Sequence, residues 1–196
     1  MAKLNLKDFI VKPGKNISLE DWAPDADGGF TKADGEARFE KNVSRMDELQ
    51  MKFWANRSRG MLIVLQGIDT AGKDGVIRSV FTHVSPLGVR AEAFGVPTEL
   101  ESRHDFLWRI HAKAPARGEM VIFNRSHYED VLFVRVNDLV PKSVWERRYE
   151  HIRGFEQMLA DEGTTIVKLF LHISKDEQRA RLQERLDNPA KHWKFE

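Results

Sequence analysis

A glycine-rich stretch, GIDTAGKDG, contains the residue types that bind phosphate groups. Gly67, Gly72 and Lys73 fit the spacing G-x-x-x-x-G-K, in which backbone N–H groups surround phosphate oxygens and the lysine reaches a bridging or terminal phosphate. The pattern normally continues with Ser or Thr, whose hydroxyl holds magnesium, but the next residue here is Asp74. The stretch predicts a phosphate-binding loop with altered metal chemistry, and a purely structural glycine turn is the alternative.

Asp69 is the carboxylate that could replace the missing hydroxyl. It lies inside the loop, where it would repel a bound phosphate unless a cation lay between them. The hypothesis is therefore a polyanion bridged by Mg²⁺, or by Mn²⁺, with Asp69 as the metal ligand. A second interpretation is that the Asp69 side chain only caps N–H groups of the loop.

The segment MVIFNRSHYED, residues 120–130, holds a second group of polar residues after an apolar run. Phosphate-loop kinases usually carry an acid at the tip of such a strand, and here Asn124 takes that place, where it can orient a water but adds no charge. Arg125 offers two parallel donors for a phosphoryl oxygen, although a surface arginine paired with a carboxylate is the alternative. Glu129 suits the first turn of a helix as well as it suits a metal or nucleotide site.

The last helical pattern follows Ser174 and carries many basic residues interleaved with acids. Arg181 and Arg185 are four residues apart, so they share one face of a helix. That face could close over transferring phosphates as a lid, and Lys194 would extend it. A solvated helix laced with ion pairs is an equally good interpretation.

These residues need a framework, and the hydrophobic pattern indicates one. Four apolar, β-prone runs cover residues 61–66, 89–94, 119–123 and 164–173. Helical patterns precede, separate and follow them, at residues 36–59, 73–84, 103–113, 127–137, 141–162 and from Ser174 to about Pro189. The alternation predicts an α/β fold, with a parallel sheet covered by helices on both faces.

Composition limits the class of protein. The chain has 196 residues, 41% of them hydrophobic, and a net charge of +1, so basic residues must cluster locally if a polyanion is to bind. The absence of cysteine excludes disulfides and thiolate chemistry. No signal-peptide core and no run near ~18 apolar residues is present, so we expect a cytoplasmic protein without a membrane or nucleic-acid partner.

The chain divides into two unequal parts. Residues 1–35 are interrupted by prolines and glycines, which predicts an extended N-terminal arm. Residues 36–196 are expected to form one kinase-like domain that includes the lid segment at about 174–196. Trp193 and Phe195 call for a further element that would bury them, so we expect C-terminal helices to be missing from these 196 residues.

Motifs from about Pro13 to the end are similar to those of the second polyphosphate kinase family. They are ISLEDW, VLQGIDTAGKDG, HDFLWRIH, IFNRSHYEDVL and a late Q-x-x-R-L-x-x-R pattern followed by Pro189 and Trp193-Lys194. The resemblance implies a phosphate-loop domain that looks like thymidylate kinase. It also implies Mg²⁺-dependent, reversible phosphoryl transfer between inorganic polyphosphate and nucleoside mono- or diphosphates, in a homo-oligomer, either a dimer or a tetramer.

Carried over by position, Lys73 resembles the family's loop lysine and Asp69 its essential loop aspartate. Arg125, Arg181 and Arg185 resemble the arginine of the second motif and the lid arginines. Two positions depart from the commonest pattern: many members have Asp at position 124, and members inactive with AMP commonly have Asn at position 129. Both departures resemble the class III subgroup, which accepts AMP as well as ADP.

The resulting hypothesis is a polyphosphate-dependent nucleotide kinase that uses AMP, ADP or ATP. The rivals are an ATP-dependent nucleoside monophosphate kinase and a non-catalytic nucleotide-binding module. The expected catalytic residues are Asp69, Lys73, Arg125 and Glu129. The expected phosphate-binding residues are Gly67, Thr70, Ala71, Gly72, Lys73, Asp74, Arg181, Arg185 and Lys194. The expected nucleotide-binding residues are Asn124, Arg125, Glu129 and Arg135.

Overall fold

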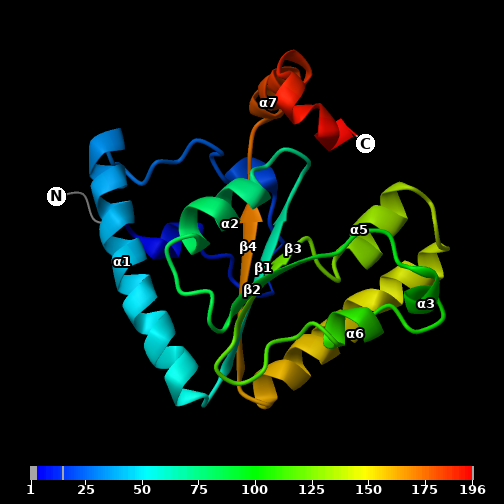
Figure 1. The fold of residues 1–196 in the computed structure, drawn as a ribbon. Coiled ribbons are helices and arrows are strands. Elements are labelled where there is room, and N and C mark those ends of the chain that lie inside the picture. Colours follow the sequence, from blue (N-terminus) through cyan, green and yellow to red (C-terminus); the bar gives the residue numbers. More distant parts are fainter. Residues whose placement is uncertain (1–3, 15, 196) are drawn as a thin grey trace.

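Four parallel strands form the centre of the molecule in a computed structural model that describes residues 4–14 and 16–195 (Figure 1). Within that part of the chain they lie in the order β2-β3-β1-β4, where the strands are β1 (Gly60–Gly67), β2 (Val89–Ala93), β3 (Met120–Asn124) and β4 (Thr164–Leu171). The register pairs Leu65 of β1 with Asn124, and Gly67 of β1 with Leu171. The segments that follow β1, β3 and β4 therefore leave the sheet at one common edge.

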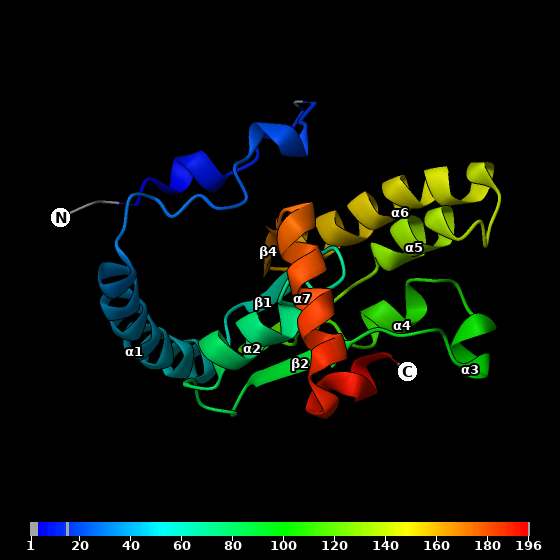
Figure 2. The same cartoon turned by 90° about the horizontal axis from the view of Figure 1, so that it is seen from above.

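Helices cover both faces of this sheet (Figures 1 and 2). The longer ones are α1 (Lys32–Asn56), α2 (Lys73–Phe81), α5 (Glu129–Val136), α6 (Lys142–Asp161) and α7 (Lys175–Asp187). Shorter elements are α3 (Glu99–Ser102), α4 (Trp108–His111) and three 3-10 helices, η1 (Leu6–Phe9), η2 (Leu19–Asp21) and η3 (Pro189–Phe195). Helices α1 and α2 lie on one side of the sheet, α5 and α6 lie on the other, and α7 stands beyond the carboxyl ends of the strands.

The core follows from the alternation of side chains along β1. Leu62 and Val64 face the cluster that contains Phe123 and Phe155, on the side of α6, whereas Ile63 and Leu65 face the side of α2. Both faces of the strand are thus apolar, as expected for a parallel sheet with helices on either side. The predicted α/β class and all four predicted strands are confirmed, with boundaries that differ by one or two residues.

The prediction of one helix over residues 103–113 is wrong. The chain instead forms α3 and α4, separated by a turn. Thr98 caps α3 earlier than the pattern suggested, and the side chain of Asp105 accepts a hydrogen bond from the Leu107 N–H at 3.0 Å. An aspartate that bonds the backbone two residues ahead competes with a continuous helix, so the segment breaks there.

The first long helix starts four residues before its predicted start at residue 36. Helix α1 begins at Lys32, because the Thr31 hydroxyl caps it by accepting from the Asp34 N–H at 3.2 Å. Before that point the described residues hold only the short helices η1 and η2. No described helix is both long enough and apolar enough to cross a membrane.

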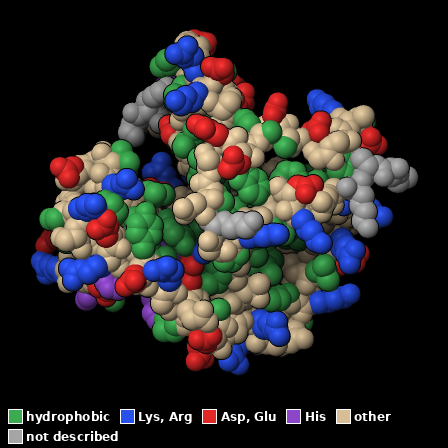
Figure 3. Space-filling view, turned by 180° about the vertical axis from the view of Figure 1, so that it is seen from behind, with side chains coloured by type: hydrophobic (Ala, Val, Ile, Leu, Met, Phe, Trp, Pro, Cys, Tyr) green, Lys and Arg blue, Asp and Glu red, His purple; other side chains and the backbone are tan. Residues whose placement is uncertain are grey.

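Strand β4 lies at an edge of the described sheet, and it leaves Val167, Leu169 and Phe170 exposed. In the view from behind, hydrophobic side chains gather near the middle of the surface, with Lys and Arg more common toward its margins (Figure 3).

Candidate active site

The glycine-rich stretch forms a loop between β1 and α2, as predicted. A Cβ atom at Gly67 would lie 2.8 Å from Ala71 Cβ and 2.9 Å from the Leu171 carbonyl oxygen, so a side chain does not fit there. Gly72 precedes α2 with φ of +99°, a left-handed conformation that glycine adopts without strain. The loop thus ends at a helix N-terminus, where free N–H groups favour an anion.

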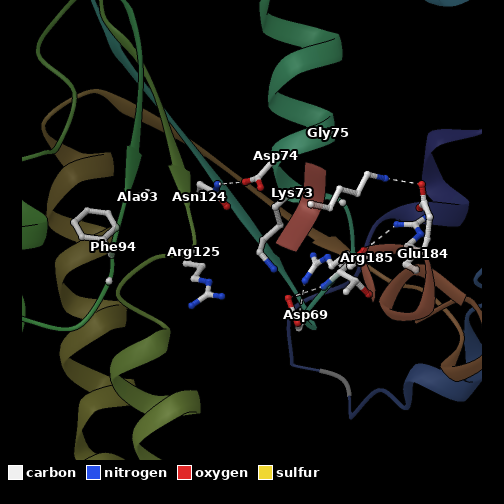
Figure 4. A pocket seen from close by; sticks show the side chains of 16 residues that line it. Asp69, Lys73, Asp74, Gly75, Ala93, Phe94, Asn124, Arg125, Glu184 and Arg185 are labelled. Atoms are coloured by element: carbon white, nitrogen blue, oxygen red, sulfur yellow. Dashed lines mark hydrogen bonds and ion pairs between the residues drawn. The ribbon is translucent and has the colours of Figure 1, made fainter. Parts of the chain in front are cut away.

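A cavity of about 420 Å³ opens above this loop, at the carboxyl edge of the sheet (Figure 4). Its walls come from the loop, from the ends of β2 and β3, and from the last helical segment. The described residues that line it are Asp69, Thr70, Ala71, Gly72, Lys73, Asp74, Gly75, Ala93, Phe94, Gly95, Asn124, Arg125, Arg181, Glu184, Arg185 and Lys191. Most of the predicted site residues therefore meet around one cavity.

Lys73 bends back over its own loop. Its Nζ donates to the carbonyl oxygens of Gly67 at 2.9 Å and of Ile68 at 3.2 Å. Burial lowers the pKa of Lys73, and the positive charge of Arg125 lowers it further, against the opposing effect of Glu129, Asp69 and Asp74. An anion bound beside Lys73 would offset both unfavourable effects, because it adds negative charge next to the ammonium group.

Asp69 caps the loop, as the second interpretation of this residue expected. Its Oδ1 accepts a hydrogen bond from the Thr70 N–H at 2.8 Å. Its Oδ2 lies 3.4 Å from a guanidinium nitrogen of Arg185, and the side chain remains 59% exposed. The two interpretations are compatible, because capping occupies one oxygen and leaves the other facing the cavity.

Asp74 and Asn124 are in direct contact although 50 residues separate them. Asn124 Nδ2 donates to Asp74 Oδ1 at 2.6 Å, which joins the first turn of α2 to the end of β3 (Figure 4). An aspartate at position 124 would set two carboxylates against each other. The contact therefore explains in physical terms why the amide at position 124 suits a loop that carries Asp74.

Arg125 follows β3 with φ of +63° and lines the cavity. Figure 4 shows its side chain and that of Lys73 extending toward the same space. Glu129, the first residue of α5, is not among the described residues that line the cavity, but it is close enough to raise the pKa of Lys73. The structure does not bring Arg135 to the cavity: it lies in the last turn of α5, with its guanidinium 4.8 Å from the centre of the Trp145 ring.

Helix α7 lies against the phosphate loop. Arg181 donates to the Thr70 carbonyl oxygen at 3.0 Å, and Gln178 donates to the Asp69 carbonyl oxygen at 3.1 Å. Arg181 also pairs with Glu177 on its own helix. The contacts with the loop agree with the interpretation of this helix as a lid. The ion pair with Glu177 agrees with the other interpretation, a solvated helix with ion pairs on its surface. The Lys194 side chain lies outside the described residues.

Comparison with known proteins decides the family. The family model for polyphosphate kinase 2 (PPK2) matches residues 29–196. This chain belongs to the polyphosphate kinase 2 family. The resemblance found in the sequence motifs is confirmed.

Curated and solved relatives agree with this family. The chain is 56% identical to the AMP/ADP-polyphosphate phosphotransferase of Meiothermus ruber, over 97% of this chain and 72% of that protein. It is 41% identical to the ADP-polyphosphate phosphotransferase of Rhodopseudomonas palustris, over 98% of this chain and 71% of that protein. The crystal structure of polyphosphate kinase 2 from Arthrobacter aurescens TC1 superposes with a TM-score of 0.91 and 44% identity, covering 100% of this chain and 70% of that one.

Several residues near the site of this polyphosphate kinase 2 chain were not predicted. Phe94, Gly95, Glu184 and Lys191 line the cavity, and only tertiary contacts bring them there. Lys191 had a signal, because it lies six residues after Arg185 in the C-terminal segment whose basic residues predict a lid.

Buried Arg109 organises the rim of the cavity. One guanidinium nitrogen donates to the Gly95 carbonyl oxygen at 2.8 Å and the other lies 3.4 Å from Asp130 Oδ2. Burial raises the pKa of Asp130, and the charges of Arg109 and Arg148 oppose that rise. The sequence contained one signal for this role of Arg109, because the arginine lies inside the apolar stretch FLWRI. A charge buried in such a stretch requires a partner.

Proposed function

We propose that this chain is a polyphosphate-dependent nucleotide kinase, which transfers a phosphoryl group reversibly between inorganic polyphosphate and AMP or ADP. The observation that carries the proposal is the meeting of Lys73, Arg125, Arg181 and Arg185 around one cavity at the carboxyl edge of the sheet, in a member of the polyphosphate kinase 2 family. Positive groups from three separate elements suit two anionic substrates that must approach each other. The names of the related phosphotransferases support the same activity.

The chemistry needs alignment and charge neutralisation more than it needs covalent catalysis. N–H groups at the start of α2 and the Lys73 ammonium would hold the transferring phosphoryl group. Arg125 would hold it from the opposite wall, and Arg181 and Arg185 would reduce repulsion between donor and acceptor. The acceptor phosphate is already anionic at neutral pH, so a general base adds little.

A magnesium ion fits the donor set of this site. Mg²⁺ in phosphoryl-transfer sites is bound through one or two carboxylates, several waters and the substrate phosphates. Asp69 supplies a carboxylate beside the loop, on a side chain that is 59% exposed and whose Oδ2 lies 3.4 Å from Arg185. The described residues contain no group of three or more His, Cys, Asp or Glu side chains that could hold an ion by themselves. We propose that Asp69 holds the ion, which when bound neutralises phosphate charge.

A homo-oligomer, a cytoplasmic location and the absence of a nucleic-acid partner stay predictions of the sequence and its resemblance. The same holds for the individual roles of Asn124 and Glu129 in nucleotide binding.

The decisive experiment compares phosphoryl donors. Purified protein is incubated with AMP, Mg²⁺ and polyphosphate, or with AMP, Mg²⁺ and ATP, and nucleotides are separated by chromatography. We expect phosphorylation with polyphosphate to be at least about tenfold faster, a difference of about 1.4 kcal/mol in activation free energy. The Lys73→Ala protein, purified in the same way, controls for contaminating kinases.

Two results would contradict the proposal. Equal or faster reaction with ATP would favour the ATP-dependent nucleoside monophosphate kinase. Nucleotide binding by calorimetry without turnover from either donor would favour the non-catalytic module.

Glu129 is expected to influence the choice of acceptor. A monophosphate leaves empty the volume that the second phosphate of ADP would fill, and a carboxylate nearby can recruit a water or a cation to it. We expect Glu129→Asn to lower kcat/KM for AMP about tenfold more than for ADP, since a charged hydrogen-bonding partner contributes about 1.5–3 kcal/mol. Initial rates with each acceptor at saturating polyphosphate measure this. Glu150→Asn, on the exposed face of α6, is the matched control, and equal losses with both acceptors would refute the role.

A further inference from the structure

The junction between β3 and α5 holds Arg125 in a backbone conformation that side chains rarely adopt. Its φ is +63°, in the left-handed region, which costs free energy in a residue with a Cβ. Such a conformation persists only where the surrounding structure holds it in place. The hydrogen bonds of the neighbouring residues show what holds the Arg125 backbone in this conformation.

The first set of contacts comes from β1. The Arg125 N–H donates to the Leu65 carbonyl oxygen at 3.2 Å, and Gln66 Nε2 donates to the Ser126 hydroxyl at 2.8 Å. The same hydroxyl accepts from the Tyr128 N–H at 3.2 Å. Ser126 is fully buried, so these bonds are shielded from water.

The second set of contacts meets at Glu156, on α6. His127 is fully buried, and its Nε2 lies 3.2 Å from Glu156 Oε1. The Tyr128 hydroxyl donates to the same oxygen at 2.8 Å, and Lys168 Nζ, from β4, donates to the other oxygen at 2.7 Å. A carboxylate only accepts, so His127 donates to it through Nε2–H. His127 Nδ1 has no hydrogen-bond partner within the described chain, which leaves Glu156 as the polar anchor of the ring.

These hydrogen bonds keep Glu156 ionised. Burial raises the pKa of Glu156, but the hydrogen bonds from His127, Lys168 and Tyr128 outweigh burial and hold the pKa at about 2. Burial, followed by the charge of Glu156, raises the pKa of Tyr128 to about 12. At neutral pH the cluster therefore has one arrangement, with a carboxylate that accepts and a phenol that donates.

We propose that Glu156 is a positioning residue of the phosphotransferase site and that it acts through Arg125. It anchors two consecutive residues of the junction, His127 and Tyr128, to α6 and to β4. With the junction fixed from both sides, Arg125 stays in its left-handed conformation and its side chain stays at the wall of the cavity. Glu156 is not among the described residues that line the cavity. This inference rests on the proposed function, in which Arg125 binds a phosphoryl group.

A double-mutant cycle tests the inference. Glu156→Gln keeps the size of the side chain but removes its charge and one acceptor. In the otherwise unchanged enzyme we expect kcat for AMP phosphorylation by polyphosphate to fall about tenfold, because small displacements of a substrate-positioning group are costly. In the Arg125→Ala enzyme the same substitution is expected to change kcat by less than about twofold. Glu150→Gln, on the exposed side of the same helix, is the matched control.

Thermal unfolding followed by circular dichroism shows whether each variant is folded at the assay temperature. A tenfold loss in folded Glu156→Gln that disappears in the Arg125→Ala background supports positioning through Arg125. A loss of equal size in both backgrounds, or no loss at all in the folded single variant, overturns it. The activity of the unchanged enzyme is measured first, so an inactive parent refutes the proposed function and not the role of Glu156.

Tyr128→Phe decides the matter if Glu156→Gln does not fold. It retains the aromatic ring and removes the hydrogen bond that the hydroxyl donates to Glu156, together with the one that it accepts from Lys168. We expect a smaller loss of kcat, about threefold, that again vanishes in the Arg125→Ala enzyme. Persistence of that loss without Arg125 would refute the connection between the cluster and the arginine.

Discussion

Lys73→Ala is expected to lower kcat/KM for polyphosphate by about 10²–10³-fold, because removing one group that stabilises transition-state charge costs about 3–4 kcal/mol. Lys73 lines the cavity and its Nζ contacts only carbonyl oxygens of its own loop among the described hydrogen bonds. It supports no packing in the core clusters, so the variant should remain folded. Initial rates over a range of polyphosphate concentrations measure the loss.

The matched control is Lys142→Ala. Lys142 is also the first residue of a helix, α6, but its side chain is 74% exposed and pairs with Glu146 one turn later. We expect its activity to stay within about twofold, since exposed pairs of this kind contribute little. Activity of the Lys73→Ala enzyme close to that of the parent, with the control also unchanged, would show that the loop does not act on phosphate.

Asp69→Asn is expected to lower kcat/KM by at least about 100-fold and to raise the Mg²⁺ concentration needed for half-maximal rate. The amide keeps the shape of the side chain but loses the charge that binds a hard cation, and a metal ion supplies several kcal/mol of charge stabilisation in such reactions. A Mg²⁺ titration of the rate, before and after treatment with a chelator, separates the two effects. Asp161→Asn, at the end of α6, is the control.

The form of the titration distinguishes two roles of Asp69. Partial recovery of rate at high Mg²⁺ indicates a weakened metal site. A large defect that no Mg²⁺ concentration relieves would point instead to the loop, because Asp69 also caps the Thr70 N–H and pairs with Arg185. A parental rate with an unchanged Mg²⁺ optimum would exclude Asp69 from metal binding altogether.

Much of the fold could be predicted because it depends on short-range patterns. Apolar residues at every position from Leu62 to Leu65 indicate a strand buried on both faces, and the core clusters divide them by alternation. The spacing of Gly67, Gly72 and Lys73 predicts the loop, because close approach and positive φ are local demands on the backbone. Family motifs, likewise read residue by residue, led to the polyphosphate kinase 2 family.

One local prediction failed where a polar side chain intervened. The apolar pattern of residues 103–113 suited one helix, yet Asp105 turned the chain by bonding the Leu107 N–H. Arg135 shares a segment with Arg125 but lies at the far end of α5, since a helix advances about 1.5 Å per residue away from the cavity. The error over residues 103–113 comes from reading Asp105 by its position in the sequence without its hydrogen bond, whereas a nucleotide-binding role of Arg135 stays a prediction.

The partners within the site were decided only by the tertiary structure. Asn124 donates to Asp74 across 50 residues, and Arg185 pairs with Asp69 across 116. Glu156 gave no signal at all, because a glutamate on an amphipathic helix looks like a surface residue until His127 and Tyr128 are placed beside it. The physical reason is that hydrophobic periodicity and backbone geometry act between near neighbours in the chain. Hydrogen bonds and ion pairs instead form between groups that the folded sheet brings within about 3 Å of each other, however far apart they are in the sequence.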